Sequence, residues 1–442
     1  MAGEGAGLAD WAGWPAGSAA WGAALLACAE GGPVALRLAP CPDLIALACG
    51  ALRAGVELIF LPPTEPAPRS AERLQQLGLT HLPLICAEAL PASLGLHCRS
   101  LKDLAQCRQP LAAEPLDGAW TVFGSGTSGQ SGAVRLGAEQ LLACARAQAR
   151  ALPLGPSDIW LSCLPLHHVG GLMAALRVSA VGGQLRLHQR FQAAAVAQEL
   201  AQVQGCSLVP TMAQRLLELP DITAWPHAPL LLLGGAGASP ALYAALAARG
   251  ARVRNCWGAT ETAAFVACQG ADSQPGADCG SPLPGVELRL DERGQVQVRA
   301  PWLQPQRRSQ RGLQSLLDPA GWWTSGDGGT ITGTQLRILG RADGAIHSGG
   351  ETIFPEQVEA RLCAHPLITA CAVLPLPDEA WGCRLIAVIE QCAGGEVEAL
   401  RAWAAEHLPP AERPAQWVVV PELPLLANGK LDRRAVARLL DL

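Results

Sequence analysis

The stretch Thr121-Val-Phe-Gly-Ser-Gly-Thr-Ser-Gly-Gln-Ser-Gly132 begins within a short run of β-forming residues, Trp120 to Phe123, and holds four glycines with four hydroxyl side chains between them. Glycine allows positive φ angles and a close approach of the backbone to a ligand. A turn of this kind can direct several backbone N–H groups at one anion, and the hydroxyls add further donors. The stretch therefore predicts a phosphate-binding loop. The alternative is a flexible Gly/Ser turn.

The same residues nearly match a Walker A loop, with Gly124 and Gly129 at the motif spacing but Gln130 where the motif has lysine. The run at 133–136 is typical of another short strand, and the next helical pattern extends from about Ala138 to Ala151. A Walker A loop would open directly into a helix. The pattern therefore disfavours a phosphate-loop NTPase, which would release ADP.

Length and composition bound the class of protein. The chain has 442 residues, of which half are hydrophobic, so two or three domains with a large core are expected. The net charge of −5 and the lack of a basic stripe argue against a nucleic-acid partner. Sixteen cysteines without a CxxC pair indicate neither a zinc site nor a disulfide framework, and reduced thiols suit a cytoplasmic protein.

The amino terminus carries Glu4 and Asp10 rather than a basic segment, which argues against a secretory signal. Residues 11–29 lack charge but are rich in Ala and Gly and include Pro15, so they predict a loop and a core helix rather than a membrane span. Only two of the 33 Lys and Arg residues are lysines, Lys102 and Lys430. A lysine in a chain with this bias is a candidate for a specific role.

Periodicity indicates the fold class. Apolar runs at 34–38 and 57–61 are typical of buried strands, and residues 43–55 between them have helical spacing. Strict alternation at 286–290 and 295–299 is typical of an antiparallel sheet. We therefore expect an α/β protein. Its large N-terminal domain, residues 1–340, has mainly parallel sheets plus a small antiparallel β region, and a small, mobile α+β C-terminal domain covers residues 341–442.

Three local predictions can be compared directly with the structure. Ser239 as N-cap and Pro240 at the first position predict a helix that ends before Gly250. Residues 62–69 predict a connector. Residues 322–329, with three glycines among them, predict a turn-rich stretch.

Eight short motifs follow one another along the chain, and each alone is a weak signal. They are Gly124 to Gly132, Pro165-Leu-His-His-Val-Gly-Gly171, Gly234-Gly-Ala236, Trp257-Gly-Ala-Thr-Glu-Thr262, Trp323-Thr-Ser-Gly-Asp327, Leu339-Gly-Arg-Ala-Asp343, Ser348-Gly-Gly-Glu351 and Asn428-Gly-Lys-Leu-Asp432. In this order and spacing they resemble the adenylate-forming acyl-CoA synthetase superfamily, from about residue 20 to the end. The short chain and the stretch at 165–172 are most similar to the 2-succinylbenzoate–CoA ligases of menaquinone and phylloquinone synthesis.

The resemblance implies an AMP-forming acid–CoA ligase that uses ATP, Mg²⁺ and coenzyme A as well as a small carboxylic acid. A carboxylate attacks the α-phosphate of ATP to give an acyl-adenylate and diphosphate, and the thiol of coenzyme A then displaces AMP. Two alternatives remain open at this point. One is a ligase for another aryl or acyl acid, and the other is a non-catalytic nucleotide-binding homologue.

The resemblance also assigns residues to the nucleotide. The loop Ser125, Gly126, Thr127, Ser128 and Gly129 would hold the β- and γ-phosphates. Adenine would lie between Trp257-Gly258, with Trp where the family usually has Tyr, and Gly234, Gly235 and Ala236, which would also line the acid pocket. Thr260 would contact the α-phosphate, and Glu261 would bind the metal. Asp327 would accept hydrogen bonds from the ribose hydroxyls, with Arg341 in support.

Other roles concern the two half-reactions. Lys430 would bridge the attacking carboxylate and the α-phosphate, a task that suits a compact ammonium better than a rigid guanidinium. Asp343 would be the hinge about which the C-terminal domain turns. His168 would gate the pantetheine tunnel, and Ser348, Gly349 and Gly350 would then come close to the thiol.

Two further points concern arginines. Arg177 follows His168 by nine residues; it is proposed to bind the second, unreacted carboxylate of succinylbenzoate, the alternative being an ordinary surface arginine. The family loop commonly carries a lysine near its end, where this chain has Gly132. Arg135 is a candidate to supply the missing charge, but only if its strand presents it to the phosphates.

Overall fold

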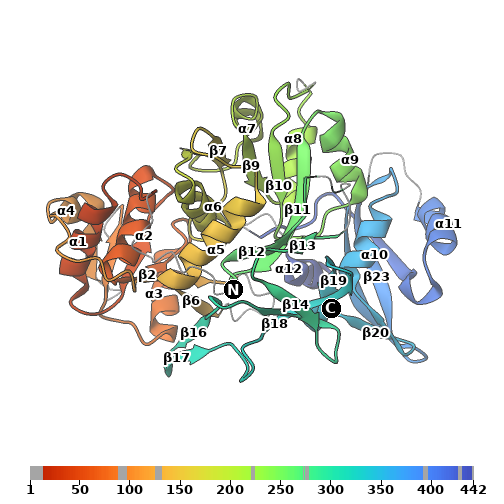
Figure 1. The fold of residues 1–442 in the computed structure, drawn as a ribbon. Helices are drawn as coiled ribbons and strands as arrows, with labels where there is room; N and C mark the ends of the chain where they lie inside the picture. Colours follow the sequence, from red (N-terminus) through yellow and green to blue (C-terminus); the bar gives the residue numbers. More distant parts are fainter. Residues whose placement is uncertain are drawn as a thin grey trace.

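The computed structural model describes residues 13–87, 97–124, 132–220, 224–271, 273, 278–391, 397–426 and 431–440. The loop residues 125–129 and Lys430 lie outside these ranges. The described chain forms two large sheets with helices around them, a smaller antiparallel sheet, and a C-terminal group of short sheets and helices at one side of the molecule (Figure 1).

The first large sheet has the strand order β17-β16-β6-β5-β2-β1-β3-β4. Its strands are β1 (Val34–Arg37), β2 (Glu57–Phe60), β3 (Pro83–Cys86), β4 (His97–Ser100), β5 (Ala119–Phe123), β6 (Ala133–Gly137), β16 (Gln306–Ser309) and β17 (Gly312–Ser315). The strands from β5 to β4 are parallel to one another, whereas β6, β16 and β17 join as antiparallel strands. The accompanying helices are α1 (Ser18–Ala29), α2 (Pro42–Ala54), α3 (Ala67–Gln76) and α4 (Leu101–Ala105).

The second large sheet has the strand order β13-β12-β11-β10-β9-β7-β8, parallel from β8 to β11. Its strands are β7 (Ile159–Ser162), β8 (Gln184–Leu187), β9 (Gly205–Leu208), β10 (Leu230–Leu233), β11 (Arg252–Ala259), β12 (Ala264–Cys268) and β13 (Ser281–Pro282). Its helices are α5 (Ala138–Ala151), α6 (Val169–Ala180), α7 (Ala193–Glu199), α8 (Pro210–Leu217) and α9 (Pro240–Ala248). Helix α5 contacts β6 and β12, and α6 contacts β7 and α2, so these two helices connect the two sheets.

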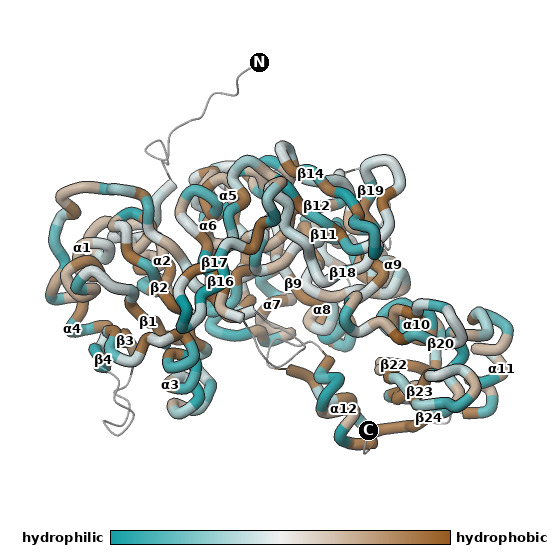
Figure 2. Tube along the Cα trace, turned by 90° about the horizontal axis from the view of Figure 1, so that it is seen from below, coloured by the Kyte–Doolittle hydropathy of each residue, from teal (hydrophilic) through white to brown (hydrophobic). Residues whose placement is uncertain are grey.

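A third sheet, β14-β15-β18-β19, is antiparallel, and the C-terminal part has the sheets β20-β21 and β22-β23-β24. The elements are β14 (Glu287–Leu290), β15 (Gln295–Arg299), β18 (Trp323–Thr332), β19 (Gln335–Arg341), the 3-10 turn η3 (Ala342–Gly344), β20 (Ile346–Ser348), β21 (Glu351–Ile353), α10 (Pro355–Leu362), β22 (Ile368–Asp378), β23 (Gly382–Gln391), α11 (Val397–His407), η4 (Pro410–Glu412), β24 (Pro414–Val420) and α12 (Arg433–Leu439). Figure 2 shows β20, β22, β23 and β24 with α10 and α11 gathered beside the larger N-terminal part. The division at 340/341 stays our proposal.

The predicted fold class is confirmed, and so are most local predictions that rest on periodicity. Helix α9 begins at Pro240, and the Ser239 hydroxyl accepts a hydrogen bond from the backbone N–H of Leu242. The prediction for 62–69 is wrong at its end, because α3 begins at Ala67. None of the helices in the described ranges is long and apolar enough to cross a membrane.

The prediction of a turn-rich stretch at 322–329 is wrong, because most of it belongs to the strand β18, which pairs with β15 and β19. Its glycines allow other groups to approach closely. A Cβ atom on Gly326 would lie 2.1 Å from the guanidinium of Arg341, and one on Gly328 would lie 2.6 Å from the ring of Phe354. Glycine in a strand often marks such an approach rather than a turn.

Candidate active site

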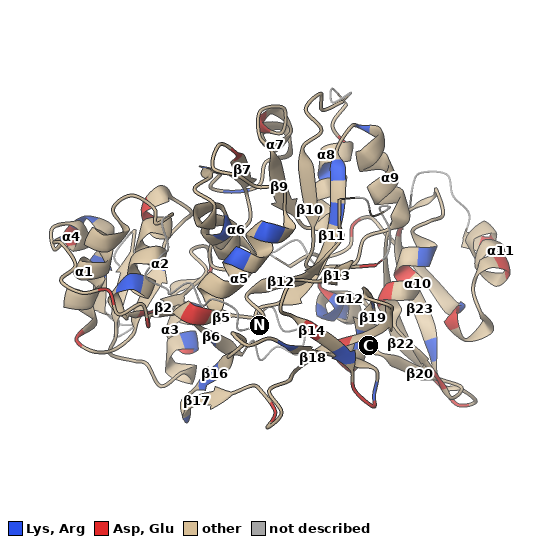
Figure 3. Cartoon of the chain, viewed as in Figure 1, with Lys and Arg blue, Asp and Glu red and all other residues tan. Residues whose placement is uncertain are grey.

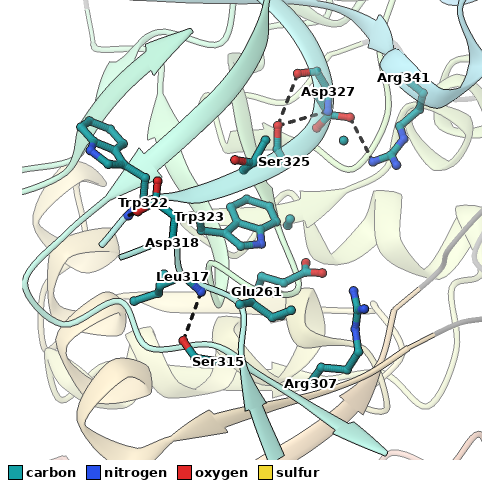
Figure 4. Close-up of a pocket in the computed structure, with 14 residues that line it drawn as sticks. Glu261, Arg307, Ser315, Leu317, Asp318, Trp322, Trp323, Ser325, Asp327 and Arg341 are labelled. Carbon is teal, nitrogen blue, oxygen red and sulfur yellow. Dashed lines mark hydrogen bonds and ion pairs between the residues drawn. The ribbon is translucent and has the colours of Figure 1, made fainter. Parts of the chain in front are cut away.

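A pocket of about 540 Å³ lies between β18, the turn after β11 and the β16–β17 hairpin (Figure 4). Glu261, Asp327 and Arg341, which the sequence assigned to metal and nucleotide, all line it. They come from three separate motifs, so the fold brings together groups that are up to 80 residues apart in the chain. The pocket is therefore the candidate nucleotide site.

Asp327 lies on β18 directly opposite Arg341 on β19. One carboxylate oxygen of Asp327 accepts a hydrogen bond of 2.8 Å from the indole N–H of Trp257, and the other is 3.4 Å from the guanidinium of Arg341. A carboxylate has about four acceptor sites. Asp327 therefore keeps acceptor capacity for the hydroxyls of a ligand, while the buried Trp257 holds it in place.

Glu261 lies in a tight turn between β11 and β12. The Thr262 hydroxyl accepts a hydrogen bond from the N–H of Ala259 and donates to backbone carbonyls within the turn. Ala263 and Ala264 have positive φ angles of 52° and 70°, which are unfavourable for residues other than glycine. Strained backbone of this kind clusters at ligand sites, where the surrounding structure enforces it.

Gly258 permits this turn to form. A Cβ atom at position 258 would lie 2.0 Å from the carbonyl oxygen of Ala264 on the paired strand. The register of β11 and β12 shifts between Trp257 and Gly258, directly before this turn. Thr260 stands next to Glu261, and its carbonyl accepts a backbone hydrogen bond from Ala263.

Burial raises the pKa of the Glu261 carboxyl above its usual value, and the nearby charges of Arg307 and Arg341 partly oppose that shift. The described residues contain no group of three or more His, Cys, Asp or Glu side chains that could form a metal cage. Mg²⁺ is usually held by one or two carboxylates together with substrate phosphates and water. Glu261 at the wall of an open pocket fits that donor set.

Gly234, Gly235 and Ala236 follow the end of β10 and are next to β11. A Cβ atom on Gly234 would lie 2.7 Å from the sulfur of Cys256, and Gly235 has a φ angle of 82°. Gly235 therefore allows a left-handed bend of the backbone, and Gly234 leaves room for the side chain of Cys256, the neighbour of Trp257. Gly235 and Ala236 are exposed.

His168 is the N-cap residue of α6, and its ring centroid is 4.3 Å from that of His167. Burial lowers the pKa of His167 to about 3, with the charges of His168 and Arg73 acting in the same direction. His167 is therefore neutral at physiological pH and serves as packing beside His168.

Arg177 lies on α6 and is 2% exposed, so the alternative of a surface arginine is wrong. Its guanidinium donates a hydrogen bond of 2.6 Å to the Ser207 hydroxyl and lies 5.4 Å from the ring centroid of Trp160 and 5.5 Å from that of Phe265. No carboxylate in the described ranges pairs with it, and its Nε has no hydrogen-bond partner there. Burial lowers the pKa of Arg177 to about 10, so it remains charged.

Arg135 is not free to replace a loop lysine. Its Nε is 3.2 Å from the carboxylate of Glu57, and its guanidinium also donates a hydrogen bond of 2.9 Å to Gln306. Arg307, which the sequence analysis did not select, lines the pocket instead. It belongs to the β16–β17 hairpin, whose polar residues gave no periodic signal.

The residues proposed for domain movement lie beyond the pocket. Asp343 forms two hydrogen bonds with Arg341, of 3.0 and 2.9 Å, and this contact holds the pKa of Asp343 below its usual value. Ser348 is buried at the end of β20. Gly349 and Gly350 have φ angles of 58° and 87°, as a tight turn between β20 and β21 requires.

The chain belongs to the AMP-binding enzyme family. The family's main model matches residues 17–301, and the model of the AMP-binding enzyme C-terminal domain matches residues 357–430. This membership and the fold confirm the predicted resemblance to the adenylate-forming superfamily.

Three individual proteins show which members of this family the chain is similar to. The chain is 30% identical over 410 residues to the 2-succinylbenzoate–CoA ligase of Escherichia coli K12, covering 92% of this chain and 87% of the relative. The solved structure of wild-type E. coli MenE, with a bound phenylether-linked analogue of OSB-AMS, is 28% identical with a TM-score of 0.76, covering 96% and 91% of the two chains. The Bacillus subtilis o-succinylbenzoate coenzyme A synthetase in complex with ATP and magnesium ion is 23% identical with a TM-score of 0.82, covering 95% and 92%.

Proposed function

We propose that this protein is an AMP-forming acid–CoA ligase that converts ATP, 2-succinylbenzoate and coenzyme A to 2-succinylbenzoyl-CoA, AMP and diphosphate in menaquinone or phylloquinone biosynthesis. The observation that carries the proposal is the pocket in which Glu261, Asp327 and Arg341 meet. Its carboxylates and guanidinium suit a ribose and a phosphate–metal group. Family membership and the named relatives support the same reaction.

In the first half-reaction, Asp327 accepts hydrogen bonds from the ribose hydroxyls, and Arg341 supports it. Trp257 stacks on adenine opposite Gly234–Ala236, and Thr260 contacts the α-phosphate. The loop hydroxyls of Ser125, Thr127 and Ser128 hold the β- and γ-phosphates. Glu261 would hold a Mg²⁺ ion, which neutralises charge on the phosphate oxygens when it is bound.

Lys430 is the proposed catalytic cation. The acid carboxylate attacks the α-phosphorus and the bond to the β-phosphate oxygen breaks, so charge moves between oxygens during the step. A compact ammonium on a flexible stem can follow this movement, which a planar guanidinium does less well. Lys430 is one of only two lysines in the chain, which supports a specific role.

In the second half-reaction the thiol of coenzyme A replaces AMP on the acyl carbon. We assign the hinge of the C-terminal domain to Asp343, the gate of the pantetheine path to His168, and contacts near the thiol to Ser348, Gly349 and Gly350. Asp343 is bound to Arg341, which in turn contacts Asp327, so a rotation at the hinge would alter the ribose site.

Arg177 is the proposed partner of the carboxylate that is not activated. A guanidinium removed from water without an anionic partner is destabilising, and such groups persist where a ligand completes the charge pair. Arg177 is fully buried and lacks a carboxylate partner in the described residues. A substrate with a second carboxylate would complete the pair.

The test is a ligation assay with ATP, coenzyme A and succinylbenzoate that follows diphosphate and separates labelled AMP from ADP. Release of AMP and diphosphate together with the thioester is expected. ADP as the product would refute the adenylation mechanism. A panel of aryl and acyl acids tests the substrate, and a higher kcat/KM for a monocarboxylic acid would refute the assignment to succinylbenzoate.

A further inference from the structure

Arg307 is a cation of the nucleotide pocket whose charge no described carboxylate neutralises by a direct ion pair. The other arginine of the pocket, Arg341, is paired with Asp343 and also contacts Asp327. In Figure 4 the guanidinium of Arg307 points across the pocket toward Glu261. Its charge acts on Glu261 and opposes the rise in that carboxyl's pKa. Arg307 is therefore available to bind an anion beside the proposed metal ligand.

Arg307 also lies beside Gly132. Strand β16 pairs with β6, so Arg307 is opposite Val134, two residues beyond Gly132. A Cβ atom on Gly132 would lie 3.8 Å from the Nε of Arg307, its nearest neighbour among the described residues. A side chain at position 132 would thus start out in the space beside the Arg307 guanidinium. This is the position at which the resemblance leads one to expect a lysine.

The neighbouring arginines are committed elsewhere. Successive side chains of a strand point to opposite faces of the sheet. Arg308, next to Arg307, forms an ion pair with Glu57, and Arg135 on the paired strand β6 binds the same carboxylate. Figure 3 shows basic residues dispersed over the described chain rather than concentrated at this site. Of these three arginines, Arg307 alone lines the pocket.

We propose that Arg307 is a phosphate-binding residue that contacts the β- and γ-phosphates of ATP and supplies, from a neighbouring strand, the positive charge that a loop lysine at position 132 would supply. This inference rests on the proposed adenylation. A guanidinium can bind two phosphate oxygens at once. When the carboxylate oxygen bonds to the α-phosphorus, the electron pair of the broken bond passes to the departing diphosphate. Arg307 stabilises that charge.

Calorimetric titration of ATP and of AMP into the full-length protein separates the roles. Arg307→Ala is expected to weaken ATP binding roughly 10- to 100-fold, because it removes a charge-assisted contact, and to leave AMP binding unchanged. Arg311→Ala is the matched control, since Arg311 is exposed in the turn of the same hairpin and carries the same charge. Equal loss of ATP and AMP affinity, or no loss of either, overturns the inference.

A variant that moves the positive charge from position 307 to position 132 gives a second, independent test. Among the described residues, a Cβ atom at position 132 meets only an ordinary contact with Arg307, so the side chain of Gly132→Lys would begin beside that guanidinium. In the Arg307→Ala background, Gly132→Lys should restore ATP affinity and acid-dependent ATP–diphosphate exchange, whereas Gly132→Ala should not. Failure of the folded double variant to recover overturns the inference. If the unaltered protein binds ATP but shows no exchange with any acid, the proposed function fails while the ATP-binding test of Arg307 still stands.

Discussion

Replacement of Arg177 tests the choice of acid most directly. Arg177→Ala should raise the KM for succinylbenzoate far more than the KM for ATP. Arg177 is 2% exposed and bound only to the Ser207 hydroxyl among described hydrogen-bond partners, so its guanidinium has capacity for a carboxylate. Arg177 does not line the nucleotide pocket, so the KM for ATP should change little.

The magnitude follows from burial. Truncating one partner of a buried, hydrogen-bonded charge pair costs about 2–5 kcal/mol, much of it from the charge left unpaired. Applied to kcat/KM for succinylbenzoate, this corresponds to a loss of about 30-fold at the lower bound and a few thousand-fold at the upper bound. In the unliganded enzyme, by contrast, removal of the buried charge should not lower the stability. Arg177→Met fills a similar volume and removes a buried charge without a described carboxylate partner, so the Tm should not fall.

Steady-state kinetics with both substrates varied, followed by diphosphate release, provide the measurement. An analogue of succinylbenzoate without the spectator carboxylate serves as the control, because it should be a poor substrate for the unaltered enzyme and lose little more with Arg177→Met. An unchanged KM for succinylbenzoate in a folded Arg177→Ala protein would remove Arg177 from the acid site. A large drop in Tm for Arg177→Met would instead assign it to structural support.

Three other predictions concern titration and the ribose contact. The pKa of His167 is lowered to about 3, so between pH 6.5, near its unfolded value, and pH 3 the unfolded chain binds one more proton than the folded chain. The free energy of unfolding therefore falls as the pH falls through this range, by at most about 1.4 kcal/mol per pH unit. In urea unfolding, His167→Gln should flatten that pH dependence. The pKa of Glu261 is raised by burial, so stability declines as pH rises through the folded value; Glu261→Gln should raise the Tm at pH 7 while the enzyme's requirement for Mg²⁺ increases, and an unchanged Tm would contradict the burial argument. Trp257→Phe keeps the aromatic ring but removes the 2.8 Å hydrogen bond to Asp327, so ATP and AMP should both bind roughly 10-fold more weakly in calorimetry, and a selective loss of ATP alone would count against a ribose role.

Periodicity in the sequence was sufficient to predict the positions of helices and strands that are buried on one or both sides. The strands β1 and β2 and the helix α2 fall within a residue or two of the predicted ranges, because their apolar spacing reflects burial directly. The order of the motifs gave the family, and the structure places Glu261, Asp327 and Arg341 around one pocket. The loop residues 125–129 and Lys430 lie outside the described ranges, so their roles stay predictions.

The errors share a physical cause, which is that distant partners decide the structure. The glycines of β18 suggested turns, but they are required by Arg341 and Phe354, which approach from later in the chain. The hairpin of β16 and β17 joins β6 across about 170 residues, and nothing local in its polar sequence signals that pairing. A surface position for Arg177, which the sequence left open as the alternative, is excluded only by the packing of distant elements, since an arginine is rarely fully buried.

Arg307 and Arg177, the two arginines proposed to bind anionic groups of the substrates, differ in exposure, and this difference leads to a final prediction about salt. Arg307 is exposed at the pocket wall, where dissolved ions screen its charge, because the screening length is about 10 Å at 0.1 M salt and about 3 Å at 1 M. Arg177 is buried and is screened far less. Raising NaCl from 0.05 to 0.5 M should therefore increase the KM for ATP more steeply in the unaltered enzyme than in Arg307→Ala, with both measured at saturating Mg²⁺. The contribution of Arg177, taken as the ratio of kcat/KM for succinylbenzoate between the unaltered enzyme and Arg177→Met, should be nearly constant over the same range. Parallel salt slopes for ATP in the two enzymes would mean that the guanidinium of Arg307 does not contact the phosphates.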